Sequence, residues 1–234
     1  MNDRELIQIV TRKVIERLNE GESCSGCALR TCKHQRACDV AAKRHKIPVG
    51  ISARHAHVTQ EHLEVLYGKG RQLTVHAPLY QPGAFAAQET LTIAGRRMRT
   101  IEGVRILGPV RNYSQVELAR TDAIRLGLDP PIRDSGDIAG SEPIVLIGPE
   151  GSVYLNEGAI CATRHIHMTP VEAEKFGVTE ASRLKVRIPG ERALTLENVR
   201  PKIHPDYVLQ MHLDTDDANA AGLRGGEGLE ILRD

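Results

Sequence analysis

"TIAGRRMRTIEGVR", residues 92–105, reappears in altered form as "RIPGERALTLENVR", residues 187–200. Shifting residues 92–128 by 95 positions aligns them without a gap onto residues 187–223, and about a third of the aligned positions are identical. The identical positions include, in the first copy, Gly95, Thr100, Val104, Asp122, Gly127 and Leu128. Self-similarity at a fixed spacing is typical of a repeated structural unit. The sequence therefore predicts a duplicated module.

Short apolar runs between glycine and proline surround this repeat, among them "QLTVHAP", "ETLTIAG" and "RLKVRIPG". Such runs are typical of short β-strands. The stretches "TQEHLEVLYG" and "TPVEAEKFGV" predict short helices, each opened by an N-capping threonine, Thr59 or Thr169. Many short strands with few long helices favour a mainly β fold of small barrels or sandwiches over a parallel α/β sheet.

The composition is ordinary for a soluble protein of 234 residues, a length that suits one large domain or two smaller ones. A net charge of +1, 3% aromatic residues and no Trp argue against a nucleic-acid partner. No apolar run approaches the roughly 20 residues that span a membrane, and "MNDRELIQIV" at the start lacks the apolar core of a signal peptide. We therefore expect a cytoplasmic protein with no membrane partner, whose five cysteines stay reduced.

Two histidine pairs occur in similar stretches, "SARHAHVT" at residues 52–59 and "RHIHMTP" at residues 164–170. Side chains two apart on a strand share a face, so each pair can point at one object. Glu117 aligns with His212 in the repeat, which gives each half a third potential ligand. The two groups are His55, His57 and Glu117 in the first half, and His165, His167 and His212 in the second. Groups of the His₂Glu and His₃ types hold catalytic zinc with one position open. Surface or core histidines with ordinary hydrogen bonds are the alternative, which the duplication disfavours.

Arg111 lies six residues before Glu117. On a strand that continued through both residues, Arg111 would share the face of Glu117 and approach the same metal. The positive charge of an arginine would be repelled by the two metal ions unless an anion lay between the arginine and the metals. This placement therefore implies an anionic substrate. The planar guanidinium suits phosphate. The alternative is a surface arginine paired with a neighbouring carboxylate.

The first 46 residues differ from the rest of the chain. Residues 3–19 have apolar residues every four positions and predict an amphipathic helix. The basic linker that follows contains four closely spaced cysteines: Cys24, Cys27, Cys32 and Cys38. This spacing is dense enough for zinc or an iron–sulfur cluster, and reduced surface thiols are the alternative. A metal-sensing or electron-relay module would depend on these cysteines.

Six motifs, in order, resemble those of the phosphate propanoyltransferase family, the phosphotransacylases of bacterial microcompartments. They are "VGISARHAHVT", "QPGAFAAQETLTI", "GVRILGPVRNYSQVELARTDA", "SGDIAGS", "RHIHMTP" and "MHLDTDDANAAG", within roughly residues 47–222. The resemblance implies reversible transfer of a short acyl group, propanoyl or similar, between coenzyme A and phosphate, with two zinc ions. It also implies two tandem small β-barrels with short helices, in which the first strand joins the C-terminal barrel.

The resemblance further predicts the division of the chain. An amphipathic helix, residues 1–20, is similar to the encapsulation peptides that bind microcompartment shell proteins, and residues 21–46 form the linker. Residues 47–53 plus 163–234 would form the barrel with the second zinc site, and residues 54–162 the barrel with the first. The protein would then lie in the lumen of a microcompartment, in propanediol degradation. The alternative for the helix is packing on the barrel or on a partner in a homo-oligomer.

Individual site residues also follow from the resemblance. Arg111 resembles the family's phosphate-binding arginine. The residues that resemble its coenzyme A contacts are Ile51, Ser52, Ala53, Arg105 and Asn219. One departure is Ala77, which replaces a basic residue often found in the family, so contacts to the coenzyme A phosphates are expected to be fewer or differently supplied.

The expected mechanism is direct attack of phosphate on the thioester of acyl-CoA, giving acyl phosphate and coenzyme A. Zinc would polarise the carbonyl and stabilise the departing thiolate, while Arg111 holds the phosphate. Cys161 is expected to be a small buried filler, with a role as nucleophile the alternative. The rival function is a binuclear zinc thioester or phosphoester hydrolase, in which water replaces phosphate.

Overall fold

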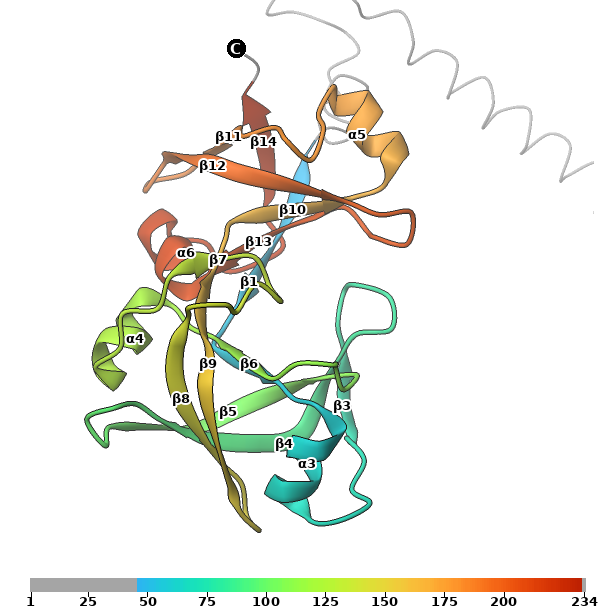
Figure 1. Ribbon diagram of the computed structural model, residues 1–234. Coiled ribbons are helices and arrows are strands. Elements are labelled where there is room, and N and C mark those ends of the chain that lie inside the picture. The colour runs from blue at the N-terminus through green and yellow to red at the C-terminus, as the bar shows by residue number, and fades with distance from the viewer. Residues whose placement is uncertain (1–45, 233–234) are drawn as a thin grey trace, which may run out of the picture. The chain divides into compact units, whose positions relative to one another are not determined.

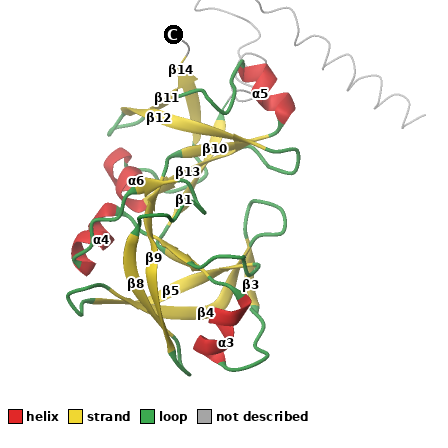
Figure 2. Cartoon of the chain, in the orientation of Figure 1, coloured by secondary structure: helices red, strands yellow, loops and turns green. Residues whose placement is uncertain are grey.

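The computed structural model describes residues 46–232, and residues from Ile47 onward form one compact unit. The predicted N-terminal helix and the four cysteines of the linker lie outside the described residues. Strands predominate in the described part, accompanied by four short helices (Figure 2). In this part, no helix has both the length and the apolar character needed to span a membrane.

One ring of six strands, here named the C-barrel, closes on itself (Figure 1). In order around the ring, the strands are β1 (Ile47–Ser52), β13 (Gln210–Asp214), β10 (His165–Met168), β12 (Leu194–Ile203), β11 (Leu184–Ile188) and β14 (Gly228–Leu232). The closing pair is antiparallel and joins β14 back to β1. The other pairs of this ring are also antiparallel, except that β1 runs parallel to β13 and β10 runs parallel to β12.

The second ring, here named the N-barrel, repeats this plan. Its strands, in order, are β4 (Phe85–Ala94), β5 (Thr100–Gly108), β2 (His55–His57), β6 (Gln115–Glu117), β9 (Ser152–Ala162) and β8 (Glu142–Ile147). The strand β8 pairs with both β9 and β4 and so closes the ring. Two further strands extend it, since β3 (Val75–Pro78) pairs with β4 and β7 (Ile132–Arg133) pairs with β9. The predicted mainly β fold with two small barrels is confirmed.

Four short helices complete the fold: α3 (Gln60–Tyr67), α4 (Arg120–Leu126), α5 (Pro170–Phe176) and α6 (Thr215–Ala221). The threonines predicted as N-caps are confirmed, because Thr59 and Thr169 each accept a hydrogen bond from the backbone of the first helical turn. The repeated glycines Gly127 and Gly222 end α4 and α6 with φ of 72° and 69°. This left-handed conformation is costly for residues with a Cβ, which explains why both copies keep glycine there.

Each barrel has its own hydrophobic core. The N-barrel buries, among others, Leu63, Leu91, Ile106 and Leu126. The C-barrel buries, among others, Ile47, Ile166, Val186 and Met211. A fully buried side chain of this size stabilises the folded state by roughly 1.5–3 kcal/mol. Two separate cores therefore hold the two strands that carry the histidine pairs.

The two barrels exchange one strand each. The strand β1 completes the C-barrel but leads directly into β2 of the N-barrel, and β9 completes the N-barrel but leads into β10 of the C-barrel (Figure 1). Equivalent positions confirm the symmetry, since Gly50 of β1 pairs with His212 and Ile160 of β9 pairs with Glu117. The chain therefore crosses between the barrels just before each histidine pair.

Candidate functional site

Each histidine pair lies on a strand between a parallel and an antiparallel neighbour. On the antiparallel side, His55 is directly opposite Glu117 and His165 is directly opposite His212. Directly opposite residues on paired strands have their side chains on the same face of the sheet. The register thus brings the third member of each group beside the histidine pair, as the alignment of the two halves predicts.

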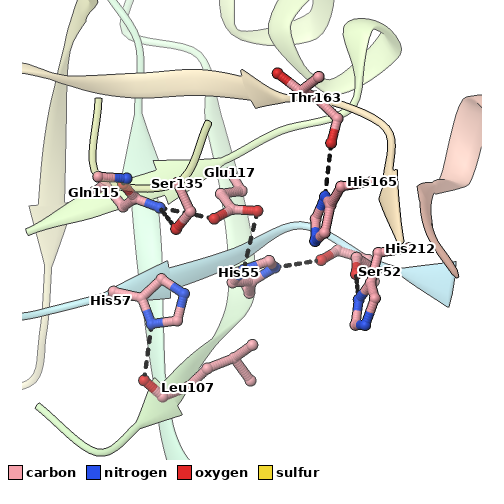
Figure 3. Close-up of polar contacts among 12 residues, drawn as sticks. Ser52, His55, His57, Leu107, Gln115, Glu117, Ser135, Thr163, His165 and His212 are labelled. Atoms are coloured by element: carbon pink, nitrogen blue, oxygen red, sulfur yellow. Dashed lines mark hydrogen bonds and ion pairs between the residues drawn. The ribbon is translucent and has the colours of Figure 1, made fainter. Parts of the chain in front are cut away.

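The two groups are compact. Within each group the potential ligand atoms all lie within 4.8 Å of one another. The Nδ1–H of His55 donates to the carbonyl of Ala53 at 2.9 Å, and that of His165 donates to the carbonyl of Thr163 at 2.7 Å. His57 Nδ1 donates in the same way to Leu107 at 3.1 Å (Figure 3). Backbone carbonyls thus orient these imidazoles and leave Nε2 free to bind a metal, a pattern typical of metal-ligating histidines.

Two ring nitrogens have no partner although they are buried. In the described part of the chain, His167 Nδ1 and His212 Nε2 are buried without a hydrogen bond. Because a buried nitrogen without a partner costs free energy, a bound cation is expected beside these two nitrogens. Three imidazoles, or two with one carboxylate, form a donor set that divalent zinc accepts. Both groups can therefore hold a metal ion.

Electrostatics favour a cation at the first group. Burial opposes ionisation of Glu117, but the charge and hydrogen bond of His55 lower the pKa of its carboxyl below the ordinary value. Burial is the largest single effect on His55 and lowers its pKa, but the charge and hydrogen bond of Glu117, together with the hydrogen bond to Ala53, outweigh it, so the pKa is raised. Glu117 Oε2 lies 3.4 Å from His55 Nε2. A buried carboxylate that stays ionised is a strong ligand for a metal cation.

The second group contains no carboxylate, and its histidines stay neutral. Burial, followed by the charge of His212, lowers the pKa of His167 to about 3. Burial and the charge of Lys202 lower the pKa of His212 to about 4 and that of His165 well below its usual value. Neutral imidazoles are the form that binds metal. The two groups thus differ by one negative charge.

Two members of each group line one common pocket. Its lining comes from both barrels and includes His55, Glu117, His165, His212, Ser52, Thr163 and Asp214. Figure 3 shows His55, Glu117, His165 and His212 gathered around one space. Ser52 Oγ at the end of β1 lies 3.4 Å from His212 Nδ1 and so connects the crossing strand to the second group.

The arginine that precedes each histidine pair has a structural role. Arg54 Nη1 contacts Asp122 of α4 at 2.8 Å, and Arg164 forms a two-pronged pair with Asp217 of α6 at 2.6 and 2.7 Å. These ion pairs fasten each crossing segment to the helix that follows the third member of the group. The repeated Arg-His-x-His-x-Thr thus combines an anchor, two potential ligands and a helix cap.

The structure corrects the prediction that Arg111 lies on a continuing strand. The strand β6 spans only Gln115–Glu117, and Arg111 lies in the preceding loop. Its Nη1 donates to the hydroxyls of Tyr113 at 2.6 Å and Ser135 at 2.9 Å. Its charge nevertheless lowers the pKa of His55 slightly. The pKa of His57 is lowered to about 3, first by burial, then by the charge of His55 and then by that of Arg111. Arg111 therefore acts on the first group electrostatically from a loop, where two hydroxyls bind its guanidinium.

The residues that resemble coenzyme A contacts are more scattered. Ser52 lines the pocket, and Ile51 and Ala53 flank it on the chain at the end of β1. Arg105 on β5 donates to the backbone carbonyl of Ala87 at 2.6 Å. Asn219 is exposed on α6 and does not line the pocket. The structure thus brings the end of β1 to the pocket, whereas Arg105 and Asn219 lie outside its lining.

Sequence reasoning missed Lys202. It lies on β12 beside His167, and its side chain is only 22% exposed. Nζ lies 3.8 Å from Asp134 Oδ1. The repeat aligns Lys202 with Leu107, so comparison of the two halves gives no signal for it. Only the pairing of β12 with β10 reveals a lysine at the site.

Comparison with known proteins identifies the class of the chain. A family model described as phosphate propanoyltransferase matches residues 48–224. A phosphate propanoyltransferase of Lachnoclostridium phytofermentans is 50% identical over 186 residues, which cover 80% of this chain and 87% of that protein. One of Thermotoga maritima is 49% identical over 187 residues, covering 80% of this chain and 89% of that protein. One of Priestia megaterium is 47% identical over 181 residues, covering 77% and 83%.

The fold, the paired groups and these matches place the chain among the acyltransferase enzymes. More specifically, it belongs to the phosphate propanoyltransferase family. The predicted resemblance is thus confirmed, and family membership supports a phosphate acyltransferase activity.

Proposed function

We propose that the chain transfers a short acyl group, propanoyl or similar, reversibly between coenzyme A and inorganic phosphate. The observation that carries the proposal is that two three-ligand groups, one from each duplicated half, each contribute two members to the lining of one pocket in a member of this family. Acyl-CoA and phosphate would meet in this pocket, and binding them together raises their effective concentration.

The six residues that would hold two zinc ions are His55, His57, Glu117, His165, His167 and His212. Zinc bound there supplies a Lewis acid for the thioester carbonyl and a soft cation for the departing sulfur. The backbone carbonyls of Ala53 and Thr163 keep their histidines in the correct tautomer and orientation. His55 and His165 are buried, which limits the access of competing water to them.

Arg111 is the proposed phosphate-binding residue. Among the described residues, no carboxylate lies within ion-pair distance of its guanidinium, in contrast to Arg54 and Arg164, which both have one. Two hydroxyls fix one of its nitrogens and leave the others available for an anion. A fixed guanidinium can bind phosphate with two parallel hydrogen bonds.

For coenzyme A, we propose contacts with the backbone of residues 51–53 and with Arg105 and Asn219. The end of β1 at the pocket supports the first of these. Ala77 on β3 offers no charge to the coenzyme A phosphates, so other basic side chains are needed for them. We also propose that the two domains are residues 47–53 with 163–234, and residues 54–162, as the two closed rings suggest.

We further propose that residues 1–20, outside the described part, attach the enzyme to microcompartment shell proteins and place it in the lumen. Deleting residues 1–20 should then abolish co-purification with shells and leave turnover unchanged. Turnover lost together with shell binding would instead indicate a role in the fold or in a homo-oligomer.

The decisive experiment measures free thiol and acyl phosphate from propanoyl-CoA, with and without inorganic phosphate. The proposal predicts that thiol appears only with phosphate, in equal amount to acyl phosphate, and that a chelator stops the reaction. Thiol release in the absence of phosphate would identify a zinc hydrolase instead. Metal analysis of the same sample tests for zinc.

A further inference from the structure

The side chain of Lys202 points to the same face as the second three-ligand group. In the parallel pair of β10 and β12, Lys202 is in register with His167. Partners in register on neighbouring strands have side chains on the same face. The charge of Lys202 accordingly lowers the pKa of His165, His167 and His212. Burial is the larger cause in all three, and for His167 the charge of His212 is also larger.

The ammonium group of Lys202 has no hydrogen-bond acceptor among residues 46–232. Within the described part of the chain, its single ion pair is the one to Asp134, at 3.8 Å, which is longer than a hydrogen bond. Asp134 already contacts Arg200 through Oδ2, and its buried Oδ1 has no hydrogen bond. The Lys202 side chain is only 22% exposed and its ammonium group makes no hydrogen bond within the described part of the chain, so this group is available to an oxygen-bearing partner.

Lys202 and Arg111 lie near neighbouring residues of one loop. Asp134 contacts Lys202, while the next residue, Ser135, accepts a hydrogen bond from Arg111 at 2.9 Å. Burial is the main cause of the lowered pKa of Lys202; the charges of Asp134 and Glu117 oppose it, and Arg200 and, least of all, Arg111 add to it. The two cations, one from each barrel, are thus close enough to repel each other weakly. An oxyanion between the two cations would relieve both this repulsion and the missing hydrogen bonds.

We propose that Lys202 is a second phosphate-binding residue, which contacts the phosphate oxygens from the C-barrel while Arg111 contacts them from the N-barrel. The inference depends on the proposed function, because inorganic phosphate is the anion in question. One cation from each barrel would place the phosphate between the two three-ligand groups. Lys202 thereby makes phosphate binding depend on both halves of the duplicated chain.

The test compares Lys202→Met with Lys202→Arg and with Lys69→Met, which removes a positive charge at an exposed position. Losing a charge-assisted contact should raise the KM for phosphate about tenfold to a hundredfold. The KM for propanoyl-CoA and the bound metal should stay unchanged. Titration calorimetry with inorganic phosphate, without acyl-CoA, should show the same loss of affinity. Lys202→Arg should restore most of this affinity, and Lys69→Met should behave as the parent protein.

An unchanged phosphate KM and affinity in Lys202→Met would overturn the inference. A lowered melting temperature with unchanged phosphate affinity would show that Lys202 is structural and would also overturn it. These outcomes are distinguishable from failure of the proposed function, in which the parent protein itself would show no phosphate-dependent release of thiol.

Discussion

Cys161 does not line the pocket and is not suited to nucleophilic attack. It is buried on β9 next to Ala162, which lines the pocket, and burial raises the pKa of its thiol to about 11. Since the thiolate is the nucleophile, a thiol that stays protonated at neutral pH is inert. We expect Cys161→Ala to keep most of the turnover and all of the bound metal. Initial rates of acyl phosphate formation and metal analysis test this expectation. An inactive variant with full metal content would instead indicate a covalent acyl intermediate.

The lowered pKa of His57 predicts that the stability of the metal-stripped protein depends on pH. Burial first, and then the charges of His55 and Arg111, lower its pKa from 6.5 to about 3. Between these values the unfolded chain binds a proton that the folded protein does not, so stability falls as the pH falls below 6.5. At pH 5 the loss from this residue is about 2 kcal/mol relative to pH 7.5. Urea unfolding at both pH values measures it.

The matched variant for this prediction is His57→Gln, which cannot titrate. It should be less sensitive to acid than the parent by about the same 2 kcal/mol. His167 and His212 change stability in the same direction, so both proteins should still lose stability at pH 5. Equal losses in parent and variant would show that His57 is not buried in its neutral form.

At the level of single elements, the cap of α5 makes a measurable contribution to stability. Thr169 Oγ1 accepts the backbone N–H of Glu172 at 3.2 Å, and the Glu172 carboxylate accepts the backbone N–H of Thr169 at 2.8 Å. Thr169→Ala removes the first of these bonds and should lower the free energy of unfolding by about 1 kcal/mol. Val171→Ala, on the exposed face of the same helix, is the control and should change little. Chemical denaturation measures both, and equal effects would mean that the cap contributes nothing.

Elements with local signals could be predicted from the sequence. The N-cap threonines, the alternation in His-x-His and the equivalence of Glu117 with His212 all depend on residues near one another or on the repeat, and the structure agrees. The shared face inferred for Arg111 and Glu117 requires a strand through both residues, but β6 is only three residues long, and no local pattern limits a strand so short. Lys202 was missed because its significance comes from pairing with a distant strand. The site thus depends partly on long-range register, which sequence spacing does not encode.

For the molecule as a whole, the exchanged strands make each barrel depend on a segment outside it. The strand β1 contributes Ile47 and Val49 to the core of the C-barrel, and its Gly50 pairs with His212. Burying two such side chains contributes roughly 3–6 kcal/mol, a large fraction of the roughly 5–15 kcal/mol that stabilises a whole domain. The second three-ligand group should therefore not survive the loss of β1, although none of its members lies on that strand.

Two truncations test this dependence. Deleting residues 1–46 leaves the compact unit whole, so turnover and the metal bound by the two three-ligand groups should persist, and any metal held by the N-terminal cysteines should disappear. Deleting residues 1–52 removes only β1 in addition, yet it opens the C-barrel between β13 and β14. We expect the longer deletion to lower the melting temperature sharply and to lose at least the metal of the His165 group, as measured by calorimetry and elemental analysis. If both truncations kept equal metal and equal melting temperatures, the exchanged strand would not be what joins the two halves of the site.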